Sequence, residues 1–307
     1  MLEGLKVVEY ATYVAAPGAG GILADWGADV IKVEPPGGDP IRLFFSSLGI
    51  ADEERNPVFD MDNRGKRGIV LDTAQEAGRA ALMRLTDPAD VFLTNVRPGG
   101  LERPGLDPAS LMARNARLIC AALTGYGLEG PDKDRPGMDA AAFWARSGLA
   151  AMFRPKGGDP VQLRTAFGDH AASLAIVSGV LAAVYERART GKGRLVDASL
   201  LRVAHYVGGS DLAIQHTRGR VASNRARKDV PNPIINTFKT ADERWVMLLA
   251  RQGEIDWPKL TRALDVEHLT LDPRFAKATA RSETGPALVA LLDAAFGART
   301  RDEIAAA

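Results

Sequence analysis

Short runs rich in β-branched residues alternate with helix-like stretches through the first part of the chain. The expected strands are LKVVEY, ADVIKVE, GIVLD, ADVFLTN and RLICAALTGYG, and the expected helices include one that ends near Trp26 and two over 74–85 and 108–114. Strands that alternate with helices pair in parallel, because each crossover brings the chain back to the same edge of the sheet. The pattern therefore predicts an α/β fold whose parallel sheet is covered on its faces.

The middle of the chain predicts a long, mostly buried helix over 169–189. Its sequence, DHAASLAIVSGVLAAVYERAR, is apolar on all sides at first and charged only at its end. TGKGR ends this helix with two glycines, and a second helix is expected over 198–215.

Residues 218–233 concentrate Arg, Lys, Asn and Pro, which is typical of an extended connection. We place a linker there, between a large α/β domain over 1–217 and a smaller α+β domain over 234–307. In the smaller domain, NTFKTADERWVMLLA predicts two strands joined by a turn, and the rest predicts helices.

Charge and apolar patterning limit the classes of partner. With 39 basic and 38 acidic residues the formal net charge is +1, so no global field attracts nucleic acid or an anionic membrane. No uninterrupted apolar stretch reaches the length of about 18 residues that a membrane span needs, and we expect a cytoplasmic protein. The single cysteine, Cys120, lies in the apolar run RLICAAL, and we expect a buried strand residue there rather than a nucleophile.

Two nucleotide-binding motifs fail where this fold would need them. In ATYVAAPGAGG the glycines have the wrong spacing for a dinucleotide fingerprint, so we do not expect Glu34 to hold a ribose. TGKGR lacks the upstream glycine and the following Ser or Thr of a phosphate-binding loop. The histidines show no metal-ligand spacing, and we expect no metal; they are His170, His205, His216 and His268.

Polar loops follow the expected strands, at the edge where open α/β sheets bind their ligands. Arg97 and Arg103 bracket a Pro-Gly-Gly turn in one of these loops. Guanidinium groups near exposed backbone amides suit phosphate binding, although each arginine alone also fits a solvated surface charge.

Asp169 follows Phe167 and Gly168 and opens the long apolar helix. One interpretation is an N-cap whose carboxylate accepts hydrogen bonds from helix N–H groups. The other is a carboxylate nucleophile, which divides an acyl transfer into easier steps through covalent intermediates. Asp139, at the end of the loop RPGMD, has the same two interpretations.

At these residues the sequence resembles the class III CoA-transferases, a family that includes formyl-CoA transferase, the carnitine CoA-transferases and the α-methylacyl-CoA racemases. The resemblance covers about two-thirds of the chain, in family order, through LKVVEYATYVAAPGAGGILADWGADVIKVEPPGGDPIR, NRGKRGIVLD, ADVFLTNVRPGGLERPGLD, NARLICAALTGYGLEGPDKDRPGMD and GDHAASLAIVSGVLAAVYERARTGKGRLVDASL.

The resemblance implies a Rossmann-like large domain, an interlocked homodimer, and transfer of CoA from an acyl-CoA donor to a small carboxylic acid. It implies that Asp169 attacks the thioester and carries covalent intermediates. Coenzyme A and acyl-CoA would be substrates, without a metal. The family's CoA-binding positions correspond to Ala15, Ala16, Leu71, Asn95, Arg97 and Arg103.

Three departures keep other functions open. Racemases of the family use a His-Asp pair in the loop equivalent to RPGMD, and here Met138 stands at the histidine position, which weakens an α-methylacyl-CoA racemase reading. The glycine-rich loop of some transferases has no counterpart in NRARKDVPNPIINTF. Family chains also continue past the end of this one, so we expect the small domain to be incomplete. A catalytically silent acyl-CoA-binding protein is therefore a further alternative.

Overall fold

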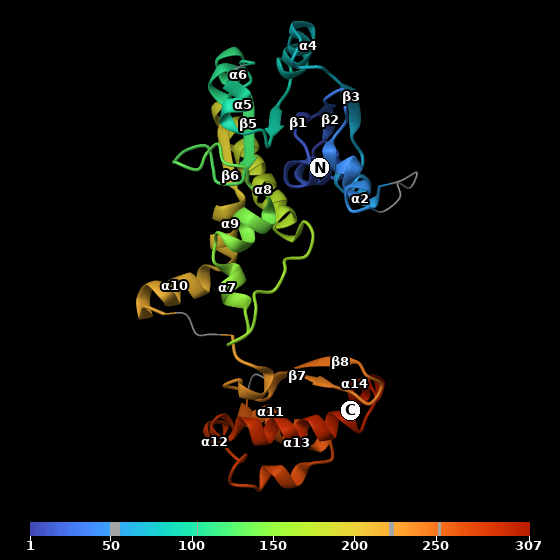
Figure 1. The fold of residues 1–307 in the computed structure, drawn as a ribbon, viewed down its shortest axis with the longest axis vertical. Coiled ribbons are helices and arrows are strands. Elements are labelled where there is room, and N and C mark those ends of the chain that lie inside the picture. The colour runs from blue at the N-terminus through green and yellow to red at the C-terminus, as the bar shows by residue number, and fades with distance from the viewer. Residues whose placement is uncertain (50–55, 103, 221–223, 251–252) are drawn as a thin grey trace. The chain divides into compact units, whose positions relative to one another are not determined.

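The chain folds into two compact units (Figure 1). The computed structural model describes residues 1–49, 56–102, 104–220, 224–250 and 253–307. Unit 1 consists of Met1–Met152 and Val161–Val221, and unit 2 consists of Phe153–Pro160 and Ala222–Ala307. The chain therefore passes through unit 2 briefly before it completes unit 1.

Unit 1 contains a six-stranded sheet in the order β3-β2-β1-β4-β5-β6, with every neighbouring pair parallel. The predicted α/β class with a parallel sheet is thus confirmed. Consecutive strands leave β1 in one direction up to β3 and in the other direction from β4 onward, so the order reverses between β1 and β4. The strands are β1 (Lys6–Tyr10), β2 (Asp29–Glu34), β3 (Arg67–Val70), β4 (Val91–Thr94), β5 (Ile119–Thr124) and β6 (Leu195–Ser199).

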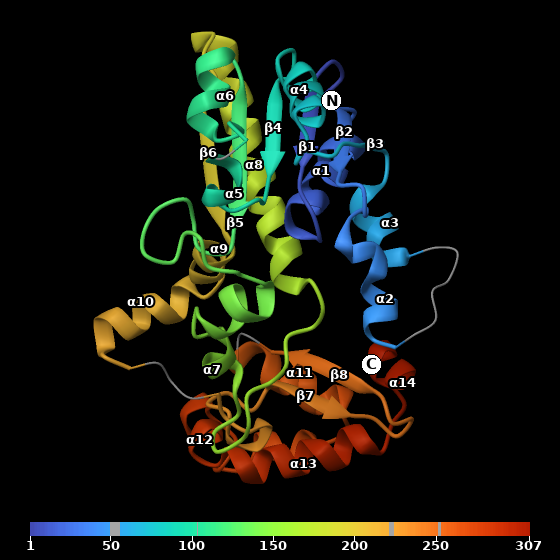
Figure 2. The same cartoon turned by 45° about the horizontal axis from the view of Figure 1, so that its top comes forward.

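Helices cover both faces of this sheet (Figure 2). On one face, Val7 and Ile119 join a core with α1 (Ala15–Asp25) and α8 (Phe167–Thr190). On the other face, their neighbours Val8 and Cys120 pack with α4 (Glu76–Thr86), α5 (Pro98–Glu102) and α6 (Pro108–Arg114). Successive strand side chains point to opposite faces, so each strand supplies both cores.

The helix expected over 198–215 is wrong in two respects. LVDAS forms β6 and pairs with β5, and the Oγ of Ser199 then accepts a hydrogen bond from the backbone N–H of Arg202, which begins the next helix. That helix is split by Gly208 into α9 (Leu200–Val207) and α10 (Gly209–Arg218). A Cβ on Gly208 would lie 3.0 Å from Met152 Cε, so a close contact with α7 (Leu149–Phe153) accompanies the break.

Helix α8 is long and apolar enough to cross a membrane by length and composition, although the sequence was expected to contain no such segment. The packing of unit 1 accounts for this composition. Ile176, Val177 and Val180 are buried in the core that α8 shares with α1 and β5.

Unit 2 contains a two-stranded antiparallel sheet, β7 (Ile235–Lys239) and β8 (Trp245–Leu249), at the predicted hairpin. Phe238 of β7 stacks on Phe296 at a centroid distance of 4.5 Å and anchors the core of this unit. Its helices are η3 (Arg227–Asp229), α11 (Gly253–Ala263), η4 (Glu267–Thr270), α12 (Ala278–Glu283), α13 (Gly285–Gly297) and α14 (Arg301–Ala306).

Four short elements of unit 1 complete the loops that matter below. They are η1 (Pro40–Leu43), α2 (Phe44–Ser47), α3 (Pro57–Asn63) and a π-helical segment, η2 (Ala140–Ala145).

Candidate active site

A cavity of about 620 Å³ opens at the carboxyl edge of the sheet in unit 1. Its walls come from the segments that follow β1, β2, β4 and β5 and from the start of α8. The cavity thus includes the point where the strand order reverses, which is where open α/β sheets bind ligands. Its lining includes Thr12, Tyr13, Val14, Ala15, Ile41, Phe44, Asn95, Arg97, Arg135, Met138, Asp139, Arg164 and Asp169.

Asp169 is the third residue of α8 and lines this cavity. The N-cap is Ala166, in the left-handed region at φ 61°, and no side chain caps the helix. The N-cap interpretation of Asp169 is therefore wrong. Gly168 lets the helix start approach η2 closely, because a Cβ there would lie 2.5 Å from Phe143 Cγ.

Burial raises the pKa of Asp169 to about 7, and the negative charges of Asp139 and Asp62 add to this effect. The charge of His170 opposes it. A carboxylate of raised pKa is a stronger nucleophile than an ordinary surface carboxylate and is typical of functional sites.

Asp139 caps η2, because its Oδ1 accepts a hydrogen bond of 2.6 Å from the N–H of Ala140. Its Oδ2 is buried and has no hydrogen-bond partner among the described residues. Burial raises the pKa of this carboxyl too. For Asp139 the cap interpretation holds, and Asp139 adds a second half-buried carboxylate to the cavity.

The loop after β1 is held at the cavity by its backbone. The side-chain amide of Asn95 donates to the carbonyl of Thr12 at 2.6 Å and accepts from the Thr12 N–H at 3.1 Å. Tyr13 has a φ of 63°, which is unfavourable for a residue with a bulky side chain. Its N–H donates to Asp39 Oδ1 at 2.9 Å, so a buried carboxylate maintains this conformation.

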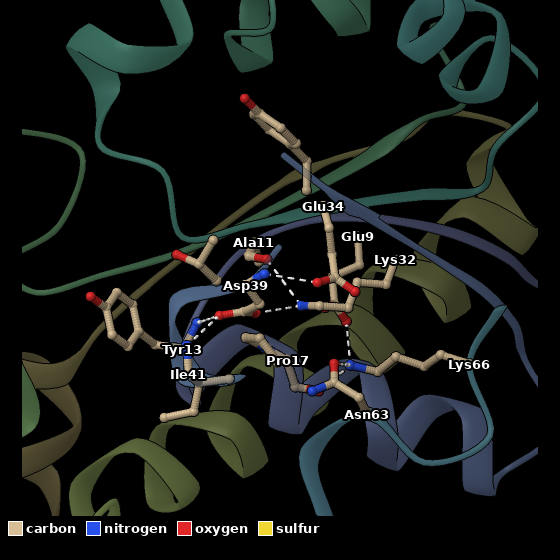
Figure 3. Close-up of polar contacts among 12 residues, drawn as sticks. Glu9, Ala11, Tyr13, Pro17, Lys32, Glu34, Asp39, Ile41, Asn63 and Lys66 are labelled. Carbon is tan, nitrogen blue, oxygen red and sulfur yellow. Dashed lines mark hydrogen bonds and ion pairs between the residues drawn. The ribbon is translucent and has the colours of Figure 1, made fainter. Parts of the chain in front are cut away.

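Beneath this loop lies a buried ion cluster of four side chains, Glu9, Lys32, Asp39 and Lys66 (Figure 3). Lys32 Nζ lies 3.0 Å from Glu9 Oε1 and 2.8 Å from Asp39 Oδ2, and Lys66 Nζ lies 2.7 Å from Glu9 Oε2. Each side chain is 2% exposed or less. Two cations and two anions balance, as buried charges require.

The buried ion cluster also binds the backbone around it. Lys32 donates to the carbonyl of Ala11 at 3.1 Å, and Lys66 donates to the carbonyl of Pro17 at 2.8 Å. Burial by itself would lower the pKa of Lys32, but the charges and hydrogen bonds of Glu9 and Asp39 outweigh it and raise the pKa. Burial lowers the pKa of the second cation, Lys66. Through these hydrogen bonds the cluster fixes the loop between β1 and α1.

The glycines of α1 make room for buried carboxylates. A Cβ on Gly20 would lie 1.9 Å from Glu9 Oε2, and one on Gly18 would lie 3.2 Å from Asp62 Oδ1. A Cβ on Gly21 would lie 2.9 Å from the backbone oxygen of Asp62. The three glycines that fail as a nucleotide motif thus allow α1 to approach β1 and α3 closely.

The sequence-predicted residues are placed as follows. Ala15, Asn95, Arg97 and Asp169 line the cavity together. Ala16 is fully buried in the core, and Leu71 is half-buried against the core on the other face of the sheet, outside the cavity lining. Arg103 lies outside the described residues.

Arg97 is exposed, and its Nη1 donates to the carbonyl of Asp134 at 2.8 Å. Arg135 and Arg164 also line the cavity, and sequence reasoning did not single them out. Three guanidinium groups at one cavity suit a ligand with several phosphates.

Sequence reasoning also did not single out Asp62 or its contact with His170. Asp62 lies on α3, and its Oδ1 is 3.0 Å from His170 Nε2. The two residues are 108 positions apart, so no local pattern could have paired them.

Glu34 accepts two hydrogen bonds from Arg42, each of 2.8 Å, and a third from the N–H of Asp39. It therefore orders the loop after β2, and the hydrogen bond from Arg42 lowers its pKa.

Comparisons with known proteins identify the family of this chain. The family model described as CoA-transferase family III matches residues 2–307. The (R)-2-hydroxy-4-methylpentanoate CoA-transferase of Clostridioides difficile is 34% identical over 99% of this chain and 76% of its own length. The cinnamoyl-CoA:phenyllactate CoA-transferase of Clostridium sporogenes is 37% identical over 90% of this chain and 68% of its own. The crystal structure of a CAIB/BAIF family protein from Brucella suis superimposes with a TM-score of 0.88 at 33% identity, covering 99% of this chain and 80% of that one.

Proposed function

The chain belongs to CoA-transferase family III, and we propose that it moves CoA through covalent intermediates on Asp169. The chain is an enzyme that transfers CoA from an acyl-CoA to a carboxylic acid, as its named relatives do. The observation that carries the proposal is a half-buried carboxylate of raised pKa that does not cap its helix and that lines a cavity together with three arginines.

In the first half-reaction, a carboxylate oxygen of Asp169 attacks the thioester carbonyl carbon. The C–S bond breaks, CoA leaves as a thiolate, and a mixed anhydride remains on Asp169. The thiolate then attacks the aspartyl carbonyl carbon, which releases the donor acid as a carboxylate and leaves an aspartyl-CoA thioester. No proton is gained or lost in these two steps.

The second half-reaction reverses this order with a new acid. The incoming carboxylate attacks the aspartyl thioester, which forms a second anhydride and frees the thiolate again. The thiolate attacks the carbonyl carbon of the new acyl group, so the new acyl-CoA leaves and Asp169 returns as a carboxylate. CoA is conserved throughout, and water must be kept from the anhydrides.

Arg97, Arg135 and Arg164 support binding of the CoA phosphates, because each lines the cavity with a charged side chain. Asn95 and the buried ion cluster support the same proposal, because they hold the loop of Thr12 and Tyr13 at the cavity wall.

Racemisation is the alternative reaction for this family, and the identity of residue 138, a methionine, argues against it. Its side chain is exposed and lines the cavity where racemases of the family place a histidine. A thioether cannot remove or return a proton at a substrate carbon.

We propose apolar acids of moderate size as substrates. Val14, Ile41 and Phe44 line the cavity and pack together as one apolar cluster. Two of the similar relatives are named for 2-hydroxy-4-methylpentanoate and phenyllactate, acids whose side chains are branched aliphatic or aromatic.

A homodimer is proposed as the functional unit. Tyr206 and Val207 of α9 and Ile214 of α10 are exposed apolar side chains, which is typical of surfaces that pair. Sedimentation velocity across a dilution series tests this proposal, and a monomer at all concentrations would contradict it.

The experiment for the transfer mechanism supplies cinnamoyl-CoA as donor and 2-hydroxy-4-methylpentanoate as acceptor, with phenyllactate and succinate as alternative acids. Mass spectrometry follows the new thioester, and hydroxylamine or borohydride traps the covalent intermediate. We expect the trapped label on Asp169 and no turnover in Asp169→Asn.

The matched control is Asp139→Asn, which removes the other half-buried carboxylate of the cavity. A label that moves to Asp139, or near-normal turnover in Asp169→Asn, would refute the assignment. Succinate as the preferred acceptor would refute the proposed acid class.

A further inference from the structure

A buried carboxylate and a histidine form a pair beside Asp169 that the transfer steps do not use. Asp62 of α3 is 2% exposed, and its Oδ1 lies 3.0 Å from Nε2 of His170. Its other oxygen, Oδ2, is buried without a hydrogen-bond partner among the described residues. His170 follows Asp169 directly on α8, so the pair lies next to the nucleophile.

The packing of α1, α3 and α8 brings Asp62 and His170 together. Asn56 caps α3 by accepting hydrogen bonds of 3.0 Å from the N–H groups of Val58 and Phe59, which orients the helix that carries Asp62. Gly18 of α1 provides the space, because a Cβ there would lie 2.7 Å from Ser173 Oγ on α8 as well as against Asp62. The contact is therefore part of the packing of α1, α3 and α8.

The charges around this pair are unevenly distributed. The carboxylates of Asp62 and Asp169 come from α3 and α8, that of Asp139 directly precedes η2, and the α1 segment AAPGAGG adds no charged side chain. The buried cation Lys66 interacts with Asp62. His170 is the cation that opposes the raised pKa of Asp169. The hydrogen bond from Asp62 raises the pKa of His170, burial opposes this, and the charges of Asp62, Asp169 and Asp139 reinforce it.

We propose that His170, held by Asp62, acts through Asp169: its imidazolium favours the ionised form of the neighbouring carboxylate and so sets the lower pH limit of CoA transfer. The inference rests on the proposed role of Asp169 as nucleophile. Neither His170 nor Asp62 lines the cavity, so both are positioning residues that act on the ionisation of Asp169.

The direction in which the pH–rate profile moves follows from the ionisation of Asp169. Only the ionised carboxylate attacks the thioester, so acylation slows below the pKa of Asp169. Loss of the His170 cation raises that pKa, and the acid limb of the rate profile moves to higher pH. A displacement of one pH unit lowers the rate about tenfold below the limb and leaves the alkaline plateau unchanged.

The test measures the single-turnover half-reaction of cinnamoyl-CoA with Asp169 between pH 5 and pH 9, with cinnamate release as the signal. His170→Gln keeps a hydrogen-bond donor toward Asp62 but removes the charge, and His170→Lys restores a cation. His205→Gln, at an exposed histidine of α9, is the matched control.

We expect the acid limb to move upward by about one pH unit in His170→Gln, to return toward the wild-type position in His170→Lys, and to stay unchanged in His205→Gln. An unmoved limb in His170→Gln would overturn the inference. Equal loss of rate at every pH in both His170 variants would do the same, because it would indicate a merely structural role.

NMR of the histidine rings in the wild-type enzyme measures the protonation state of His170 directly and does not depend on a folded His170 variant. We expect His170 to be protonated at pH 7 and to become neutral there in Asp62→Asn, and a neutral His170 in the wild type overturns the inference. Trapping at Asp169 separates the two proposals. With no adduct on Asp169 the proposed function fails, whereas an adduct with an unmoved limb refutes only the role of His170.

Discussion

Replacing Asp169 with Asn is expected to stabilise the fold at neutral pH while it abolishes CoA transfer. Burial first, and then the charges of Asp139 and Asp62, raise the pKa of this carboxyl from 3.8 to about 7 in the folded chain. In the unfolded chain the same group ionises near its ordinary value. The unfolded state thus loses the proton first, so the wild-type free energy of unfolding falls between about pH 4 and pH 7 and then levels off.

The size of the effect follows from the same pKa values. The difference between 3.8 and about 7 corresponds to about 4 kcal/mol at 1.36 kcal/mol for each pH unit. This is an upper value, because the side chain is partly exposed to solvent at the cavity. We expect Asp169→Asn to raise the free energy of unfolding by about 1–4 kcal/mol at pH 8 and by much less at pH 4.5.

Urea unfolding followed by tryptophan fluorescence at the two pH values measures this difference. Asp211→Asn, at an exposed carboxylate of α10, controls for a general effect of removing one negative charge. If the gain is equal at pH 4.5 and pH 8, or if Asp169→Asn is destabilised at pH 8, the buried-charge account of Asp169 is wrong.

Four other substitutions or treatments test the site and the core around it. Lys32→Met leaves the buried ion cluster with an uncompensated negative charge and should lower the free energy of unfolding by about 3–5 kcal/mol in urea, whereas a loss below 1 kcal/mol would contradict its burial. Gly20→Ala places a Cβ against a cluster carboxylate and should lower the melting temperature, whereas Gly209→Ala, with open space around it, should not; equal effects would contradict the close approach. Cys120, whose pKa burial raises to about 12, should resist Ellman's reagent at pH 8 until urea unfolds the chain, and rapid reaction of the native enzyme would place it at the surface. Arg97→Ala should weaken CoA binding by about 1–3 kcal/mol in calorimetry, and unchanged affinity would return Arg97 to the class of solvated surface charges.

The sequence determined the features that depend on local periodicity. Apolar, β-branched runs separated by helical stretches predicted β1 to β5 and their parallel pairing, because each side chain's face is set within a few residues. The position of Asp169 at the start of a long apolar helix could also be predicted from the sequence. Whether its carboxylate caps the helix could not be predicted, because this depends on the left-handed turn at Ala166.

The tertiary structure decided what depends on partners distant in the chain. The segment LVDAS forms a strand by pairing with the edge of β5. Its short sequence alone does not distinguish a strand from the start of a helix. The carboxylate of Asp62 meets His170 across 108 residues, and the clearance at Gly18 that admits it is a property of three packed helices. Local sequence sets the direction of a side chain along its own element, but burial and neighbouring charge are set by the elements that pack against it. The sequence thus indicated Asp169 as the candidate nucleophile, whereas the raised pKa of Asp169 and the contact between Asp62 and His170 exist only in the folded protein.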